Sequence, residues 1–139
     1  MKRILPLILI LIAVILAGCG SASVSDVTPT PTPDPAILSA TQPIGENIIN
    51  SIANDDYDAF IRDMDETMIG SFDETTFEDL RSQLDSSLGS YQSNEFQTTL
   101  LEDGYYIAYF TLHFANGDAA MRVVITTTEP YKVSGLWFQ

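Results

Sequence analysis

Between residues 44 and 88 the apolar residues recur every three or four positions, which is the spacing of one face of an α-helix. Asn54-Asp55-Asp56 interrupts this pattern and can cap a second helix; Ser71 or Asp73 can cap a third, and Gly89 can end it. The pattern therefore predicts three amphipathic helices. Their apolar faces are Ile44, Ile48, Ile49 and Ile52; Tyr57, Phe60, Ile61 and Met64; and Phe77, Leu80, Leu84 and Leu88.

After Gly89 the pattern changes to alternation, with apolar residues at every second position of Tyr105–Phe114. Asp103-Gly104 and Asn116-Gly117 flank this segment and are typical of hairpin turns. The alternation predicts four antiparallel strands whose one apolar face is covered by the helices, an α+β fold. The predicted strands are Ser90–Leu101, Tyr105–Phe114, Met121–Thr128 and Lys132–Phe138, with a turn at Glu129-Pro130 before the last.

The N-terminus carries an apolar run, Ile4–Ala17, preceded by Lys2 and Arg3. A membrane-spanning helix needs roughly 20 apolar residues, whereas the apolar part of a secretory signal needs about 7–15. The run fits the second length and ends in small residues typical of a cleavage site. An uncleaved N-terminal helix and simple secretion are the alternatives that the residues leave open.

Leu16-Ala17-Gly18-Cys19 resembles the lipobox of prokaryotic lipoproteins. The resemblance implies cleavage before Cys19 and a diacylglyceryl group on its thiol, which would attach the protein to the outer side of the cell membrane. Two acyl chains hold a protein stably on a bilayer, whereas one holds it weakly. Cys19 is also the only cysteine of the chain, so no disulfide within the chain can support the fold.

The residues that follow Cys19 predict a disordered, proline-rich stalk, because Thr and Pro alternate from Thr28 to Pro33. Sugars on these threonines would also suit such a stalk. The predicted organisation is a signal peptide over residues 1–18, the lipidated cysteine and linker over residues 19–35, and one α+β domain over residues 36–139.

Charge excludes one class of partner. Removal of Lys2 and Arg3 from the six basic residues leaves four against nineteen acidic ones, a net charge of −15. Such a surface repels nucleic acid and anionic lipid headgroups, so we expect the membrane to be contacted through the lipid anchor and no nucleic acid to be bound.

The order of the elements resembles the domain-of-unknown-function 3887 family of the nuclear-transport-factor-2-like (cystatin-like) superfamily. The resemblance runs from about Ile44 to Phe138 and rests on Asn54–Phe60, Met64–Met68, Leu88-Gly89 and Gly135-Leu136-Trp137-Phe138. It implies a strongly curved sheet that wraps around the helices as a cone. Members of this superfamily include isomerases, cyclases and binding modules, so the resemblance implies a fold and leaves the activity open.

Motifs for catalysis and metal binding are weak. His113, the only histidine, falls on the outer face of its predicted strand, where a surface role is expected. A single histidine and a lipidated cysteine exclude an ordinary zinc site. Residues 63–74 place oxygen ligands at the spacing of a calcium loop, but Met68 stands where that loop needs glycine. We therefore expect no metal, no cofactor and no catalytic residue.

Aromatic residues are the remaining candidates for a site. In a hollow cone, six of them would line a ligand cavity, although such residues more often fill a core: Tyr57, Phe60, Phe110, Phe114, Trp137 and Phe138. The outer strand face with Tyr105, Ile107 and Tyr109 is apolar for a solvated surface and predicts a homodimer contact.

Together these observations predict a membrane-anchored, extracytoplasmic lipoprotein with a binding domain for a protein partner or a small apolar ligand. The alternative is an enzyme of the superfamily type, an isomerase or hydrolase accessory, that uses buried carboxylates and tyrosines.

Overall fold

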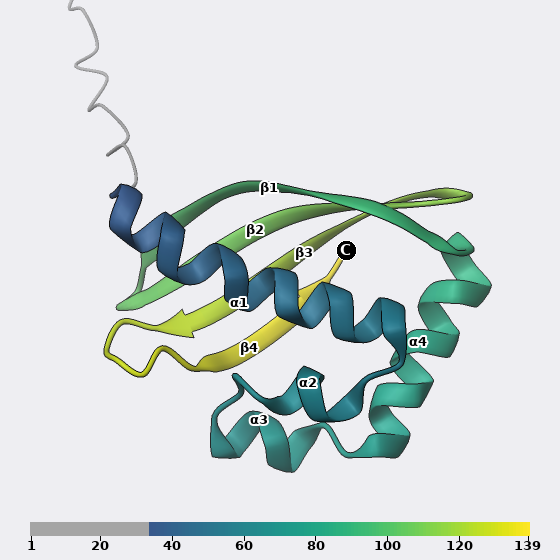
Figure 1. Cartoon of the computed structure of the whole chain (residues 1–139), viewed down its shortest axis with the longest axis horizontal. Coiled ribbons are helices and arrows are strands. Elements are labelled where there is room, and N and C mark those ends of the chain that lie inside the picture. Colours follow the sequence, from purple (N-terminus) through teal and green to yellow (C-terminus); the bar gives the residue numbers. More distant parts are fainter. Residues whose placement is uncertain (1–33) are drawn as a thin grey trace, which may run out of the picture. The chain divides into compact units, whose positions relative to one another are not determined.

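The computed structural model describes residues 34–139, which form four helices followed by a four-stranded sheet (Figure 1). The predicted signal peptide, the lipobox with Cys19 and the stalk as far as Pro33 lie outside the described residues. Within residues 34–139 the helices come first in the chain and the strands second, so the predicted α+β order is confirmed.

Each of the four helices begins after an aspartate whose side chain accepts a backbone N–H of the first turn, which satisfies one of the free donors there. The caps are Asp34, Asp56, Asp65 and Asp73. They start α1 (Pro35–Asn54), α2 (Tyr57–Ile61), α3 (Glu66–Ser71) and α4 (Glu74–Leu88). Gly89, at φ 79°, ends α4 as predicted.

Three features of the helical half differ from the prediction. Met64, assigned from sequence to the second helix, lies beyond the end of α2 at Ile61 and forms a bridge with Val133. Helix α1 begins at Pro35, well before the apolar stripe that starts at Ile44, because Asp34 caps it and proline suits a first helical position. Pro35, assigned to the linker from sequence, therefore belongs to the helix. Helix α3 was not predicted; it is short and buries only Met68, so it carries almost no periodic signal.

The sheet is an antiparallel meander in the order β1-β2-β3-β4. Its strands are β1 (Tyr91–Glu102), β2 (Tyr105–Phe114), β3 (Gly117–Thr126) and β4 (Val133–Phe138). Asp103 and Gly104 both have positive φ in the turn between β1 and β2, as the Asp-Gly pair predicts. Strand β3 starts at Gly117, earlier than the predicted Met121, because Gly117 already pairs with Phe114.

The core lies between α1 and the inner face of the sheet. Every second residue of β2 from Ala108 to Phe114 is buried, as the alternation predicts, and the isoleucines of α1 pack against them. Gly45 lets α1 approach closely, because a Cβ at that position would overlap the ring of Phe110. The Thr41 and Thr99 hydroxyls, 2.8 Å apart, join α1 to β1 in the interior. Helix α1 is thus closely packed against the sheet.

Figure 1 shows α1 lying along the sheet, whereas α4 stands at one end of it. Only Phe77 and Leu84 of α4 are buried, although its apolar stripe is as long as that of the other predicted helices. Over the range 34–139, no helix combines the length and apolar character that a membrane crossing requires.

Candidate functional site: a groove between α4 and β4

An open groove of about 460 Å³ lies between α4 and the last two strands. One wall is formed by Leu80, Leu84 and Leu88, which follow one another on a single face of α4. The opposite wall is formed by Leu136 and Phe138 of β4, with Ala119 of β3 beside them. The groove exists because the apolar stripe of α4 is only partly covered by the sheet.

Charge is sparse along the groove. Asp118 is the one ionisable side chain among its lining residues, and the polar remainder consists of Gln83, Ser87 and Gln139. The lining holds this single carboxylate, and the His113 ring that pairs with Asp118 lies on the outer face of the sheet, so the lining suits binding better than catalysis.

Strand β4 borders this groove with a partly free backbone edge. Ala120 and Gln139 exchange two backbone hydrogen bonds, at 2.8 and 2.9 Å, so residues two and four positions before Gln139 also point their backbone groups toward β3. Leu136 and Phe138 therefore point their N–H and C=O away from β3. Neither residue has a hydrogen-bond partner on that outer edge within residues 34–139.

The beginning of the same edge is occupied. The N–H of Val133 donates to the Asp63 carbonyl at 2.8 Å, and the N–H of Asp65 donates to the Val133 carbonyl at 2.9 Å. Met64 and Val133 form a parallel bridge there. Thus the segment before α3 covers the first residue of β4, and the Ser134 hydroxyl also donates to Asp65 at 2.8 Å. Leu136, Trp137 and Phe138 follow and border the groove.

The six aromatic residues predicted to line a cavity do not gather around one space. Phe60 and Phe110 are 0% and 1% exposed and fill the core, and Phe114 is also buried. Tyr57 is half-buried, and its hydroxyl donates to the Phe72 carbonyl at 2.8 Å. Only Trp137 and Phe138 border the groove, and the Trp137 ring lies toward Arg122 on the outer face of the sheet.

Packed aromatic side chains fill the interior of the domain away from the groove. Phe60 contacts Phe72 and Phe77 at centroid distances of 5.4 and 4.7 Å, and Phe96 contacts Phe110 at 5.2 Å. Such pairs stabilise a core beyond their buried area. These aromatic residues therefore fill the core in this part of residues 34–139.

The outer face of the sheet carries a second notable cluster, the Tyr109–Arg122–Trp137 row. These residues are direct neighbours on β2, β3 and β4. The Arg122 guanidinium carbon lies 5.7 Å from the Tyr109 ring and 5.9 Å from the Trp137 ring. Its buried Nε has no acceptor within the part of the chain that the structure describes.

The two aromatic residues of this row differ in exposure. The Tyr109 hydroxyl donates to Glu102 at 3.0 Å, and burial, with this hydrogen bond, raises the pKa of Tyr109. Trp137 is 49% exposed, and its indole lies against Gly135, where a Cβ would overlap the ring. The row gives the uncovered sheet face an aromatic and cationic centre.

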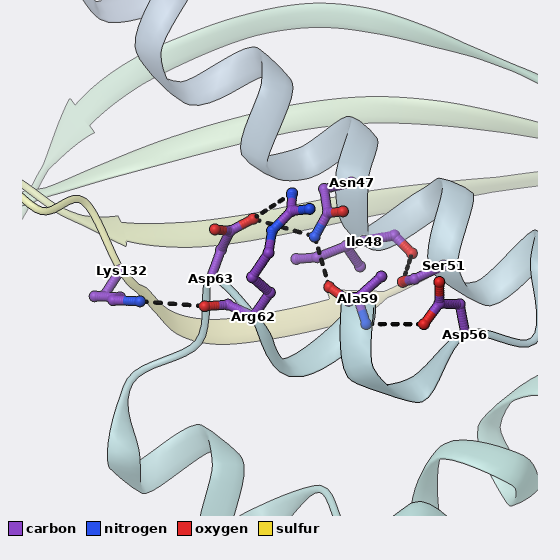
Figure 2. A network of polar contacts seen from close by, with 8 residues as sticks. All are labelled: Asn47, Ile48, Ser51, Asp56, Ala59, Arg62, Asp63 and Lys132. Atoms are coloured by element: carbon purple, nitrogen blue, oxygen red, sulfur yellow. Dashed lines mark hydrogen bonds and ion pairs between the residues drawn. The ribbon is translucent and has the colours of Figure 1, made fainter.

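A polar network joins α1, the α2–α3 segment and the start of β4 (Figure 2). Asn47 donates to the Ala59 carbonyl at 2.7 Å and to the Asp63 carboxylate at 3.1 Å, which Arg62 also approaches at 3.3 Å. Lys132 donates to the Arg62 carbonyl at 3.2 Å. These groups satisfy one another and connect elements, so the network is structural.

The remaining candidates from sequence are separated in the structure. His113 lies on the outer face, as predicted, and its Nδ1 is 2.8 Å from the Asp118 carboxylate across the β2–β3 hairpin. Asp65, expected as a calcium ligand if residues 63–74 formed a loop, instead caps α3. Hydrogen bonds from the Met68 N–H and the Ser134 hydroxyl lower its pKa below 3.8.

A second depression of about 410 Å³ lies where the end of α1 meets α4 and the start of β1. Its charged lining residues are Glu78, Arg81 and Asp85. Arg81 is already engaged, because it donates to the Ile52 carbonyl at 2.8 Å and pairs with Asp55. This arginine closes the C-terminal end of α1. Within residues 34–139, no three His, Cys, Asp or Glu side chains come together as metal ligands would.

No family model, curated protein or solved structure matches the chain. The groove and the outer-face row therefore stand on their own geometry. Sequence reasoning missed the groove lining on α4, because Leu80, Leu84 and Leu88 were assigned to a covered helix face. The sequence does carry one signal for the groove: α4 has more large apolar residues than the short strand β4 can cover.

Proposed function

We propose that this chain is a lipoprotein, anchored by Cys19 on the extracytoplasmic side of the cell membrane, whose domain binds a protein partner or a small apolar ligand. The groove between α4 and β4 supports the binding part of this proposal, because it is open and its walls are formed largely by half-buried apolar side chains. Apolar grooves with few polar groups are typical of binding sites.

The proposed anchor is supported by Leu16-Ala17-Gly18-Cys19 and by the basic start before the apolar run. Mass spectrometry of protein extracted from membranes should find Cys19 as the first residue, with a diacylglyceryl group. The variant Cys19→Ser should move the protein from the membrane to the soluble fraction. An unmodified Cys19, or an intact residue 1–18 segment, would refute the anchor.

The proposed fold assignment is a cone of the nuclear-transport-factor-2-like type that resembles the domain-of-unknown-function 3887 family. Helices that precede a four-stranded meander support it.

Binding in the groove can be tested with Nile red, a neutral apolar dye whose emission rises when it leaves water. The full chain in lipid nanodiscs should bind the dye at a site that Leu80→Ser weakens about tenfold, since burial of a leucine side chain contributes about 1.5–3 kcal/mol. The matched control is Ile69→Ser on α3, which changes an exposed apolar residue away from the groove. Equal binding by both variants would refute the site.

We further propose a homodimer contact through the outer face, as the aromatic side chains there favour. The structure corrects one part of the expected face, because Ile107 is only 5% exposed and Tyr109 is half-buried. Tyr105 and Trp137 are 42% and 49% exposed, and Tyr, Trp and Arg are the residues most enriched at interface centres. Because the processed chain has a net charge of −15, salt should strengthen such a dimer. Sedimentation should show a dimer that Trp137→Ser dissociates; a monomer at every salt concentration would refute it.

A further inference from the structure

We propose that the free edge of β4 binds an extended segment of a partner protein, which joins the sheet as an added strand. This inference rests on the proposed function and specifies its ligand: an apolar segment of polypeptide. It is supported by the outer backbone groups of Leu136 and Phe138, which have no hydrogen-bond partner among residues 34–139 and lie beside the apolar groove.

Backbone hydrogen bonding selects a strand as the occupant. Leu136 and Phe138 each present one N–H and one C=O on the outer edge, and an extended chain about 4.8 Å away can pair with them. A helix or a small apolar molecule satisfies its hydrogen bonds internally or has none, so it leaves these groups unpaired. Strand addition at an exposed edge is a recurrent mode of peptide recognition.

At the start of this edge, a segment of the same chain already pairs with β4 through backbone hydrogen bonds. Asp63 and Asp65 already make two backbone hydrogen bonds to Val133, with Met64 parallel to β4. The covering segment then continues into α3. The next residues of the edge, Leu136, Trp137 and Phe138, include neither a proline nor a charged residue that would protect it. Edge strands without such protection are prone to pairing.

Side-chain alternation defines the sequence of the partner segment. Residues that face inward would enter the groove between β4 and Leu80, Leu84 and Leu88, so they should be apolar. Residues that face outward would lie beside Trp137, which is exposed on the other face. Apolar residues at every second position therefore suit this edge.

Charge favours a neutral or basic segment. Asp118 is the only charged side chain of the groove, and acidic residues outnumber basic ones by nineteen to six in the whole sequence. An acidic segment would be repelled, and the repulsion would weaken in salt.

The test uses a short soluble peptide in which valine alternates with threonine between terminal lysines. Its partner is the full chain in lipid nanodiscs. The peptide should bind, protect the amides of Leu136 and Phe138 from hydrogen exchange, and displace Nile red. A matched peptide with N-methyl groups at the pairing amides keeps the side chains but loses the donors, so it should bind about tenfold more weakly or worse. Replacement of the lysines by glutamates should also weaken binding, and salt should reduce that difference.

Several outcomes would overturn the inference. Equal binding of the methylated and parent peptides would leave the groove as an apolar site and exclude strand addition. Nile red binding without peptide binding would do the same. Failure of both probes would refute the proposed function as well. Protection of the Leu136 and Phe138 amides in a concentration-dependent dimer without peptide would assign the edge to a second copy of the chain.

Discussion

Helices α1 and α4 are built alike and packed differently. Each begins with an aspartate cap and carries a long apolar stripe, but α1 buries Ile48, Ile49 and Ile52 against the sheet, whereas α4 buries only Phe77 and Leu84. The difference lies in what each helix meets. Helix α1 uses Gly45 to approach the sheet, whereas α4 stands at the end of the sheet and the groove lies between it and β4. Apolar surface that finds no cover within the domain is available for binding.

The largest test of this comparison replaces an aromatic residue of the packed end. Phe60→Ala removes a fully buried ring between Phe72 and Phe77, and we expect a loss of about 3–5 kcal/mol in the free energy of unfolding. Leu80→Ala in the groove should cost less than about 1.5 kcal/mol, because that side chain already contacts water. Urea denaturation measures both, and equal losses would contradict the distinction between packed and open ends.

The next test compares two helical glycines. Gly45→Ala should destabilise the chain by about 1–3 kcal/mol, since the new methyl group overlaps the buried Phe110 ring and α1 must move away from the sheet. The matched control, Gly70→Ala in α3, places its methyl group in open space. Because alanine favours helix, this control should be stabilised by up to about 1 kcal/mol.

Thermal melting of the two variants reports the sign directly. If Gly45→Ala is as stable as the unchanged chain, α1 can move away from the sheet at little cost. The distinction between a closely packed α1 and a loosely packed α4 would then be wrong. Loss of stability in Gly70→Ala would contradict the exposed position of α3.

These particular residues also show what could be predicted from sequence. The alternation from Tyr105 to Phe114 gives β2 its exact bounds, because the period of a strand is a local property. The aspartate caps are likewise local, because each side chain accepts a hydrogen bond from a backbone N–H two or three residues later. Helix α3 could not be found, since its six residues hold one buried side chain and its support comes from Val133, far along the chain.

The groove was unpredictable for a related reason. The stripe of Leu80, Leu84 and Leu88 says that α4 has an apolar face, but the angle between α4 and the sheet decides whether that face is covered. The same holds for the aromatic candidates: Phe60 and Trp137 are similar in a sequence pattern, yet one is 0% and the other 49% exposed. Exposure follows from the tertiary position of each strand and helix.

A smaller test examines the polar contact that holds α1 to β1. The Thr41 hydroxyl lies 2.8 Å from the Ile37 carbonyl, to which it donates, and 2.8 Å from the Thr99 hydroxyl, from which it then accepts. Thr41→Val leaves the buried Thr99 hydroxyl without a partner and should cost about 1–2 kcal/mol. Thr99→Val should cost less, because Thr41 keeps its bond to Ile37.

The double variant completes this test. With both hydroxyls removed, the loss should be smaller than the sum of the two single losses, since no unpaired group remains. Additive losses in urea denaturation would show that the two threonines do not interact, and that α1 is held by its apolar face alone.

The smallest effect concerns the occupied start of β4, which contrasts with its free end. Asp65 accepts hydrogen bonds from the Met68 N–H and the Ser134 hydroxyl, and these hold its pKa below 3.8 in the folded chain. A depressed folded pKa adds stability above the unfolded value, and this contribution disappears as the pH falls through the folded value. Ser134→Ala removes one of the two bonds, so it should raise the pKa of Asp65, reduce stability near neutral pH, and flatten the loss of stability below pH 3.8.

A matched carboxylate separates this effect from general acid denaturation. Asp73 caps α4 and also has a pKa lowered by hydrogen bonds, here from the Thr76 side chain and N–H, but it has no contact with β4. Ser134→Ala should therefore shift the NMR titration of Asp65 and leave that of Asp73 unchanged. Hydrogen exchange should at the same time become faster at the Val133 amide, while the amides of Leu136 and Phe138, which have no partner to lose on that edge, stay as they were. Faster exchange at all three amides would mean that β4 opens as one unit, and the division of its edge into an occupied start and a free end would then be wrong.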